Sequence, residues 1–179
     1  VITGAELNDI SDDDFLRTVQ NYSVYARVSP EHKVRIVKAW QDNGKVVAMT
    51  GDGVNDAPSL KQADIGIGMG ITGTEVSKGA SDMVLADDNF ATIVHAVEEG
   101  RKVFANIQKA VQYLLSANLG EVLTLFIATV LGWQILEPIH LLWINLVTDV
   151  FPAIALGLEE AEKDVMEQAP RGRSSNFFS

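Results

Sequence analysis

The pattern of apolar and polar positions divides the chain near residue 100. Before this point, short apolar runs alternate with segments whose apolar residues recur at helical spacing, and charged residues occur throughout. After it, two long apolar stretches follow, at residues 114–133 and 139–158. Alternating strands and helices are typical of doubly wound α/β domains, and apolar stretches of about 20 residues are long enough to span a bilayer. We therefore predict a partial α/β domain followed by an α-helical transmembrane hairpin.

Local signals predict the elements of the first part. Strands are expected at 22–28, 46–49, 65–69 and 83–85. Ser11 and Ser29 are candidate N-caps, Pro30 and Pro58 stand where helices should open, and a further helix should begin near Thr74. A last helix, from about residue 90, meets no proline and a single glycine, so it should continue into the apolar region and couple the two parts.

Composition narrows the function further. The formal net charge of −10 argues against a nucleic-acid partner, because phosphate backbones attract basic surfaces. No cysteine is present, which excludes disulfides and thiolate metal sites. The first residues have no signal-peptide pattern and no initiator Met, so we expect a piece of a longer chain.

The stretch VVAMTGDGVNDAP, residues 46–58, is the strongest candidate for chemistry. It predicts a strand that ends in a glycine-rich loop carrying Asp52 and Asp56, at the sheet edge where α/β domains place their sites. Two acids fixed on a tight loop without their own cationic partner make a plausible Mg²⁺ site that handles a phosphoryl group. An isolated Asp-Gly pair would more often be a turn, with the second acid a helix cap.

A second acidic string, Asp87-Asp88-Asn89, does not have the spacing of an EF-hand loop. We interpret it as the cap of the helix that begins near Phe90.

The two apolar stretches contain acids, Glu121 in the first and Asp149 in the second. A charge near the bilayer centre costs on the order of 2.5 to 3.5 kcal/mol, so something must offset it. Amide and hydroxyl side chains share helix faces with these acids, namely Asn118, Asn145 and Thr148. Interhelical hydrogen bonding would explain the amides and the hydroxyl, but it explains two unpaired acids poorly. We therefore predict ion binding.

Pro152 adds a backbone effect to the second stretch. It has no N–H to donate to the carbonyl of Thr148, so it should kink or unwind the helix there. Freed carbonyls beside carboxylates are the oxygen ligands that Ca²⁺ prefers.

Basic residues flank the two stretches at their outer ends only, which predicts a multi-pass membrane protein with both outer ends cytoplasmic and membrane lipid as a partner. These residues are Arg101, Lys102, Lys109, Lys163, Arg171 and Arg173. The alternative is a buried core hairpin.

Several motifs in order resemble type II P-type ATPases. TGDGVNDAPSLKQADIGIGM resembles the hinge motif of that family, and YARVSPEHKVRIV resembles its ARVxPxxK segment. SANLGE and LLWINLVTD resemble its fifth and sixth transmembrane helices. The resemblance implies a partial haloacid dehalogenase-like domain at 1–100, a long helix and transmembrane hairpin at 101–160, and a truncated cytoplasmic loop at 161–179.

The resemblance also implies roles in phosphoryl transfer from ATP. Lys33 matches the lysine that contacts the phosphorylated Asp, and Asp52 matches the Mg²⁺-ligating acid. Asp56 matches the second acid that shapes the site, while Arg27 and Asn55 match positions that contact nucleotide phosphate.

In the membrane, the resemblance is to calcium pumps of the sarcoplasmic reticulum type. The matching ion ligands are Asn118, Glu121, Asn145, Thr148 and Asp149. Sodium-potassium pumps carry an acid where this chain has Asn145, which favours Ca²⁺ as the transported ion.

The chain departs from the family by lacking a DKTGT string, and therefore the aspartyl nucleophile. It also lacks the actuator's TGES loop and the nucleotide-binding domain. We expect it to be inactive alone and to need the remainder of the pump as its partner. Two alternatives stay open: a membrane-anchored haloacid dehalogenase-type phosphatase, and a short non-enzymatic regulator of a full pump.

Overall fold

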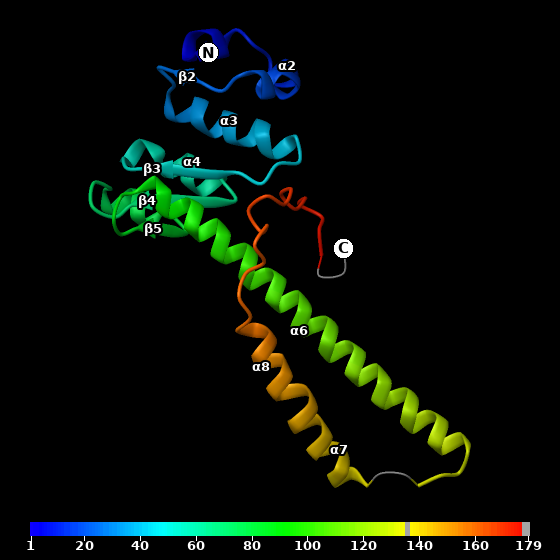
Figure 1. Ribbon diagram of the computed structural model, residues 1–179. Coiled ribbons are helices and arrows are strands. Elements are labelled where there is room, and N and C mark those ends of the chain that lie inside the picture. Colours follow the sequence, from blue (N-terminus) through cyan, green and yellow to red (C-terminus); the bar gives the residue numbers. More distant parts are fainter. Residues whose placement is uncertain (135–136, 177–179) are drawn as a thin grey trace. The chain divides into compact units, whose positions relative to one another are not determined.

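The computed structural model describes residues 1–134 and 137–176. They form two compact units, one of Val1–Ile93 with Pro170–Ser174, the other built on Val94–Ala169. Helix α6 (Phe90–Val130) begins in the first unit and continues without a break into the second (Figure 1). The expected continuity past Gly100 is therefore confirmed.

The first unit contains two parallel sheets with helices between and around them. Strands β1 (Ile2–Thr3) and β2 (Tyr25–Ala26) form one sheet. Strands β3 (Ala48–Gly51), β4 (Ile65–Met69) and β5 (Met83–Leu85) form the other in the order β3-β4-β5. Helix α3 (Pro30–Asp42) lies between the two sheets (Figure 1). The predicted α/β class is confirmed.

The shorter helices of this unit sit in the connections. They are α1 (Gly4–Asn8), α2 (Asp12–Thr18), the 3₁₀ turns Val19–Asn21 and Val54–Asp56, α4 (Ala57–Gln62) and α5 (Glu75–Gly79). Ser11 and Ser29 each cap the following helix by accepting a backbone N–H, as predicted. Thr74, where the sequence predicts only the start of a helix, caps α5 in the same way. Pro58 lies in the first turn of α4.

Two predicted strands are shorter than their apolar runs. Within 22–28 only Tyr25–Ala26 pairs as a strand. The preceding 3₁₀ turn ends at Asn21, and the N–H of Tyr22 donates to the Val19 carbonyl. The second run, expected as a buried strand from residue 46, pairs as β3 only from Ala48, and Val46 is 57% exposed.

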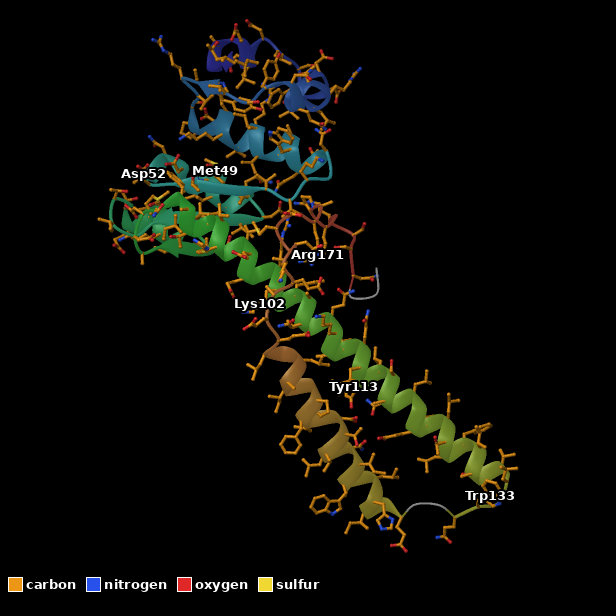
Figure 2. All side chains as sticks on the ribbon, in the orientation of Figure 1. Met49, Asp52, Lys102, Tyr113, Trp133 and Arg171 are labelled. Carbon is orange, nitrogen blue, oxygen red and sulfur yellow. The ribbon has the colours of Figure 1, made fainter. Side chains whose placement is uncertain are left out.

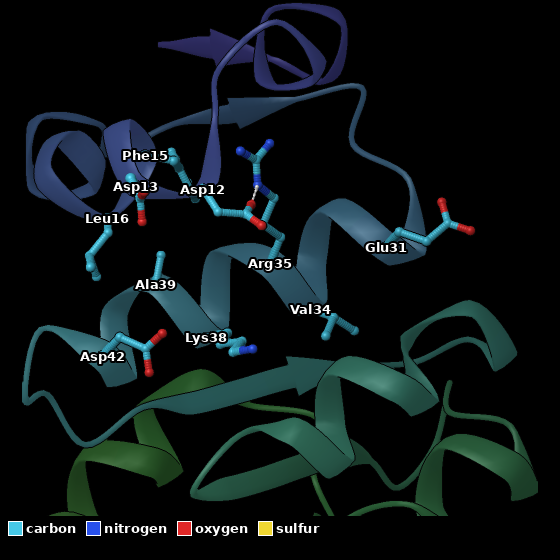
Figure 3. A pocket seen from close by; sticks show the side chains of 10 residues that line it. All are labelled: Asp12, Asp13, Phe15, Leu16, Glu31, Val34, Arg35, Lys38, Ala39 and Asp42. Carbon is cyan, nitrogen blue, oxygen red and sulfur yellow. Dashed lines mark hydrogen bonds and ion pairs between the residues drawn. The ribbon is translucent and has the colours of Figure 1, made fainter.

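Arg35 of α3 joins the N-terminal helices to the rest of the unit. Its guanidinium donates to Asp12 Oδ1 at 2.7 Å and to the carbonyls of Leu7 and Ile10, and it lies 5.1 Å from the Phe15 ring centroid. A surface cleft of about 370 Å³ runs along this contact between α2 and α3 (Figure 3). Since each of the three guanidinium nitrogens of Arg35 donates to a partner within the unit, we interpret Arg35 as a residue that stabilises the fold.

The second unit is a helical hairpin with a return segment. After α6 come α7 (Pro138–Ile144), a π-helix (Asn145–Val150) and α8 (Phe151–Gly157). Helix α6 and the helix Ile139–Gly157 are long and apolar enough to cross a membrane, and only 6% of each apolar window is buried. Neither helix therefore has the burial of a core helix in the described part of the chain.

Candidate functional site

Asp56 is the best-anchored side chain at the carboxyl end of β3. It is 6% exposed, and its Oδ2 accepts the backbone N–H groups of Asp52 at 3.2 Å and Gly53 at 3.1 Å. Its Oδ1 accepts from Lys33 Nζ at 2.5 Å. A Cβ on Gly51 would lie 2.5 Å from the Cβ of Asp56, so only glycine fits beside this carboxylate.

The expectation that both loop acids lack a cationic partner is wrong for Asp56. Lys33 reaches it from the first turn of α3, an element that the loop sequence does not contain. Burial acts to raise the pKa of Asp56, but the hydrogen bond from Lys33, the two backbone N–H donors and the Lys33 charge together hold this pKa below its ordinary value. Asp56 is thus an ionised anchor, while the Asp52 side chain remains exposed.

A cleft of about 480 Å³ opens where these residues meet. Figure 2 shows Asp52 at this end of the sheet. The lining consists of Lys33, Thr50, Gly51, Asp52, Asp56, Met69, Thr72, Asp88 and Phe90. The structure therefore brings together three of the predicted site residues, Lys33 from α3 and both Asp52 and Asp56 from the loop after β3.

Two predicted nucleotide contacts do not line this cleft. Arg27 and Asn55 are both exposed, and neither side chain has a hydrogen bond or ion pair in residues 1–134 and 137–176. Arg27 also has a φ of 52°, a left-handed conformation that is uncommon for residues other than glycine.

The string Asp87-Asp88-Asn89 caps α6 only in part. Asn89 Oδ1 accepts the N–H of Ala91 at 3.0 Å, as a cap should, and Asp87 Oδ2 accepts from the Thr92 hydroxyl at 2.7 Å. Asp88 instead accepts the N–H groups of Ile71 and Thr72 from the loop after β4. The sequence gives no local signal that Asp88 belongs to the cleft, since the partners that place it there are 16 and 17 positions away.

The donor set in the cleft suits Mg²⁺ held jointly with a phosphate. The described residues contain no group of three or more His, Cys, Asp or Glu side chains placed to hold a metal. Mg²⁺ commonly takes one or two carboxylates and fills its shell with waters and phosphate oxygens. Asp52, exposed beside the anchored Asp56, fits that requirement.

In the second unit, acids and amides of the two apolar helices meet. The Asn145 amide lies against the Glu121 carboxylate. With the amide nitrogen assigned to this side, as two acceptor oxygens require, it would donate to them at 2.9 and 3.0 Å. Asp149 is 8% exposed, and its Oδ1 has no hydrogen-bond partner among the described residues. Asn118 and the Thr148 side chain are exposed and have no contact of this kind in the same residues.

The helix departs from α-helical geometry in the turn before Pro152, where the sequence predicts a kink or unwinding. The helix continues through a π-helical segment at Asn145–Val150. The Thr148 carbonyl accepts a hydrogen bond from the hydroxyl of Tyr113 on α6, a residue that sequence analysis missed. Tyr113 is labelled on α6 in Figure 2.

Polar side chains of α6 also hold the segment that follows α8. Arg101 donates to the carbonyls of Val165 and Gln168 at 2.9 Å, and Asn106 donates to that of Glu159 at 2.8 Å. Lys109 pairs with Glu159 Oε2 at 2.6 Å. The end of the hairpin is therefore closed by the basic residues that flank the apolar stretches.

Comparison with known proteins gives two family matches. Residues 3–64 match the family described as haloacid dehalogenase-like hydrolase, and residues 133–179 match cation transporting ATPase, C-terminus.

Relatives match along the whole chain. Calcium-transporting ATPase 1 of Bacillus cereus is 56% identical over 100% of this chain and 20% of its own length. The endoplasmic reticulum calcium ATPase srcA of Aspergillus fumigatus is 53% identical over 96% of this chain and 18% of its own. A crystal structure of a zinc-transporting PIB-type ATPase is 30% identical, with a TM-score of 0.56, over 74% of this chain and 20% of that one. The chain thus spans about a fifth of the curated relatives that it matches, and it belongs to the P-type ATPase family of cation transporters.

Proposed function

We propose that this chain supplies part of the phosphorylation domain and one transmembrane hairpin of an ATP-driven Ca²⁺ pump. In this proposal, residues 1–100 belong to the phosphorylation domain, 101–160 form the long helix and hairpin, and 161–179 form a cytoplasmic loop. The names of the relatives as calcium-transporting ATPases support Ca²⁺ as the cargo. The partners are membrane lipid and the other domains of the pump.

The cleft would stabilise phosphoryl transfer from ATP to an Asp outside this segment. The Lys33 ammonium lines the cleft, where its charge would offset that of the transferring group. Asp52 would hold Mg²⁺, which supplies further charge neutralisation when bound. Asp56 keeps Lys33 and the Asp52 backbone in place through the contacts described above. Arg27 and Asn55 would contact nucleotide phosphate.

The observation that carries the transport proposal is Asp149, an acid buried within an apolar helix with one oxygen lacking a donor. Such a group is costly in a membrane unless it is paired, and a bound cation would pair it. Glu121 and Asn145 lie in contact across the two helices, and with Asn118 and Thr148 they would complete this chain's share of the Ca²⁺ ligands.

The test uses a complete pump that carries this segment. Phosphorylation from radiolabelled ATP should require Ca²⁺, and Asp149→Ala should abolish that requirement or the phosphorylation itself. Asp52→Asn should prevent phosphorylation at physiological Mg²⁺ while leaving Ca²⁺ binding at equilibrium intact. Glu160→Gln, at an exposed acid outside the apolar stretches, is the control. Unchanged Ca²⁺ dependence in Asp149→Ala would contradict the proposal.

A further inference from the structure

Asp88 is held in a conformation that side chains rarely adopt. Its φ is 50°, in the left-handed region, and Asp is among the few residues that tolerate it. Such outliers persist where surrounding contacts over-determine them, and they concentrate at functional sites. The contacts here are made by the side chain of Asp88 itself.

The Asp88 carboxylate binds the loop after β4 through three donors. Oδ1 accepts the N–H of Ile71 at 2.9 Å, and Oδ2 accepts both the N–H and the hydroxyl of Thr72 at 2.8 Å. These donors lower the pKa of Asp88, the N–H of Ile71 contributing most. The carboxylate is thus an ionised clamp on one end of this loop.

The other end of the same loop binds the backbone of Asp52. The N–H of Thr74 donates to the Asp52 carbonyl at 2.9 Å, and the Ser77 hydroxyl donates to the same oxygen at 3.1 Å. Thr72 therefore bonds to Asp88, and Thr74, two residues further along the chain, bonds to Asp52. Together these contacts connect Asp88 to Asp52. Asp88, Thr72 and Asp52 also line one cleft.

We propose that Asp88 is a positioning residue for Asp52. It fixes loop 71–74, and this loop fixes the Asp52 carbonyl, which sets the direction in which the Asp52 carboxylate enters the cleft. The consequence for Mg²⁺ rests on the function proposed above, whereas the connection to the Asp52 backbone does not.

Asp87 provides a matched control, because it is adjacent and bonds only within its own turn and α6. Its carboxylate accepts from Asn89 and Thr92 and has no hydrogen bond to loop 71–74 in the described residues. A general loss of stability would follow from removing either acid. A displaced Asp52 should follow only from removing Asp88.

The experiment uses the full 179-residue chain, ¹⁵N-labelled in detergent micelles, and measures amide hydrogen exchange. Asp88→Gly keeps the left-handed backbone and removes the clamp, so exchange at Thr74 should rise by about tenfold, the effect of losing one or two hydrogen bonds. Asp88→Asn, which keeps one acceptor, should give an intermediate rate. Asp87→Asn should leave Thr74 at the wild-type rate. Unchanged exchange at Thr74 in Asp88→Gly would overturn the proposal.

A titration with Mg²⁺ alone then separates positioning from folding. The amide signals of Asp52 and Gly53 should shift with Mg²⁺ in the wild type, and the apparent Kd should rise by roughly tenfold or more in Asp88→Gly, in line with a misplaced ligand. If Asp88→Gly binds Mg²⁺ as tightly as Asp87→Asn does, Asp88 only holds the loop in place, and its proposed role in positioning Asp52 is overturned. If Asp52→Asn responds to Mg²⁺ like the wild type, the Mg²⁺ assignment in the proposed function fails, while exchange at Thr74 still decides the connection.

Discussion

The hydroxyl of Tyr113 donates a hydrogen bond to the backbone carbonyl of Thr148, the carbonyl that Pro152 leaves without its α-helical donor. The two residues lie on different helices of the hairpin, so one side chain both satisfies a backbone group and joins the helices. Backbone groups without partners are costly in a bilayer, which gives this contact a reason beyond packing.

Replacing Tyr113 with Phe should therefore lower the free energy of unfolding of the hairpin by roughly 0.5 to 1.5 kcal/mol. In a Pro152→Ala background, the restored N–H at position 152 can donate to Thr148, so the same replacement should cost less. Thermal unfolding of the four proteins in micelles gives the coupling between the two positions. If the two replacements change the free energy of unfolding additively, the Tyr113 hydroxyl does not compensate for the N–H that Pro152 lacks.

Replacing Lys33 with Met should destabilise the first unit by about 2 kcal/mol, since it leaves the buried Asp56 with its backbone donors but without its cation. Adding Asp56→Asn should recover part of this loss. Urea unfolding followed by tryptophan fluorescence measures both effects. Lys38→Met, at an exposed lysine of the same helix, should change stability little. A larger loss in the double variant than in the single one would contradict the ion-pair explanation.

The pH dependence of the free energy of unfolding should reveal the contribution of the Asp56 carboxylate. Its native pKa is lowered, so its contribution is fully present above the unfolded pKa of about 3.9. As the pH falls below this value the unfolded chain binds the proton first, and the contribution is lost as the pH falls through the native pKa. The difference in unfolding free energy between wild type and Asp56→Asn should therefore be constant from pH 5 to 7 and shrink below about pH 4. A difference that grows on acidification would refute this sign.

Arg173 should hold the segment Pro170–Ser174 against the first unit. Its guanidinium donates to the Lys45 carbonyl at 3.1 Å and pairs with Asp64. Arg173→Ala should cost at most about 1 kcal/mol, because the pair is partly exposed. Asp64→Ala should cost more, since the N–H of Val47 also loses its acceptor.

Limited proteolysis provides the readout for this contact. Cleavage after Arg171 should accelerate in Asp64→Ala relative to wild type, and Lys61→Ala, at an exposed lysine of α4, should leave the rate unchanged. Equal cleavage rates in Asp64→Ala and wild type would show that the segment is held by other contacts.

Elements with local signals were predictable from sequence. Ser11, Ser29 and Thr74 cap helices as their side chains and positions indicate, and the long helix passes Gly100 because no proline interrupts it. The N-terminal β1 and α1 were missed although Thr3 and Glu6 form a capping box, a pattern that the sequence does contain.

Several residues of the candidate site were predictable from the sequence, but the contacts between them were less so. Lys33 and Asp56 lie 23 positions apart, and their ion pair depends on how α3 packs against α4 and the 3₁₀ turn Val54–Asp56. The sequence of the loop, taken without α3, therefore suggests that neither Asp52 nor Asp56 has a cationic partner. Asp88 resembles a helix cap in sequence, and only the loop after β4 turns it toward the cleft. The roles assigned to Arg27, Asn55 and the intramembrane oxygens remain predictions.

The unbroken length of α6 has a mechanical consequence. Its 41 residues, at 1.5 Å of rise each, form a rod about 60 Å long, twice the hydrocarbon thickness of a bilayer. In a rigid rod of that length, a tilt of about 5° displaces one end by about 5 Å relative to the other, as far as one helical turn. A small tilt of α6 beside Phe90 would therefore displace the far end of this helix by about the length of one helical turn.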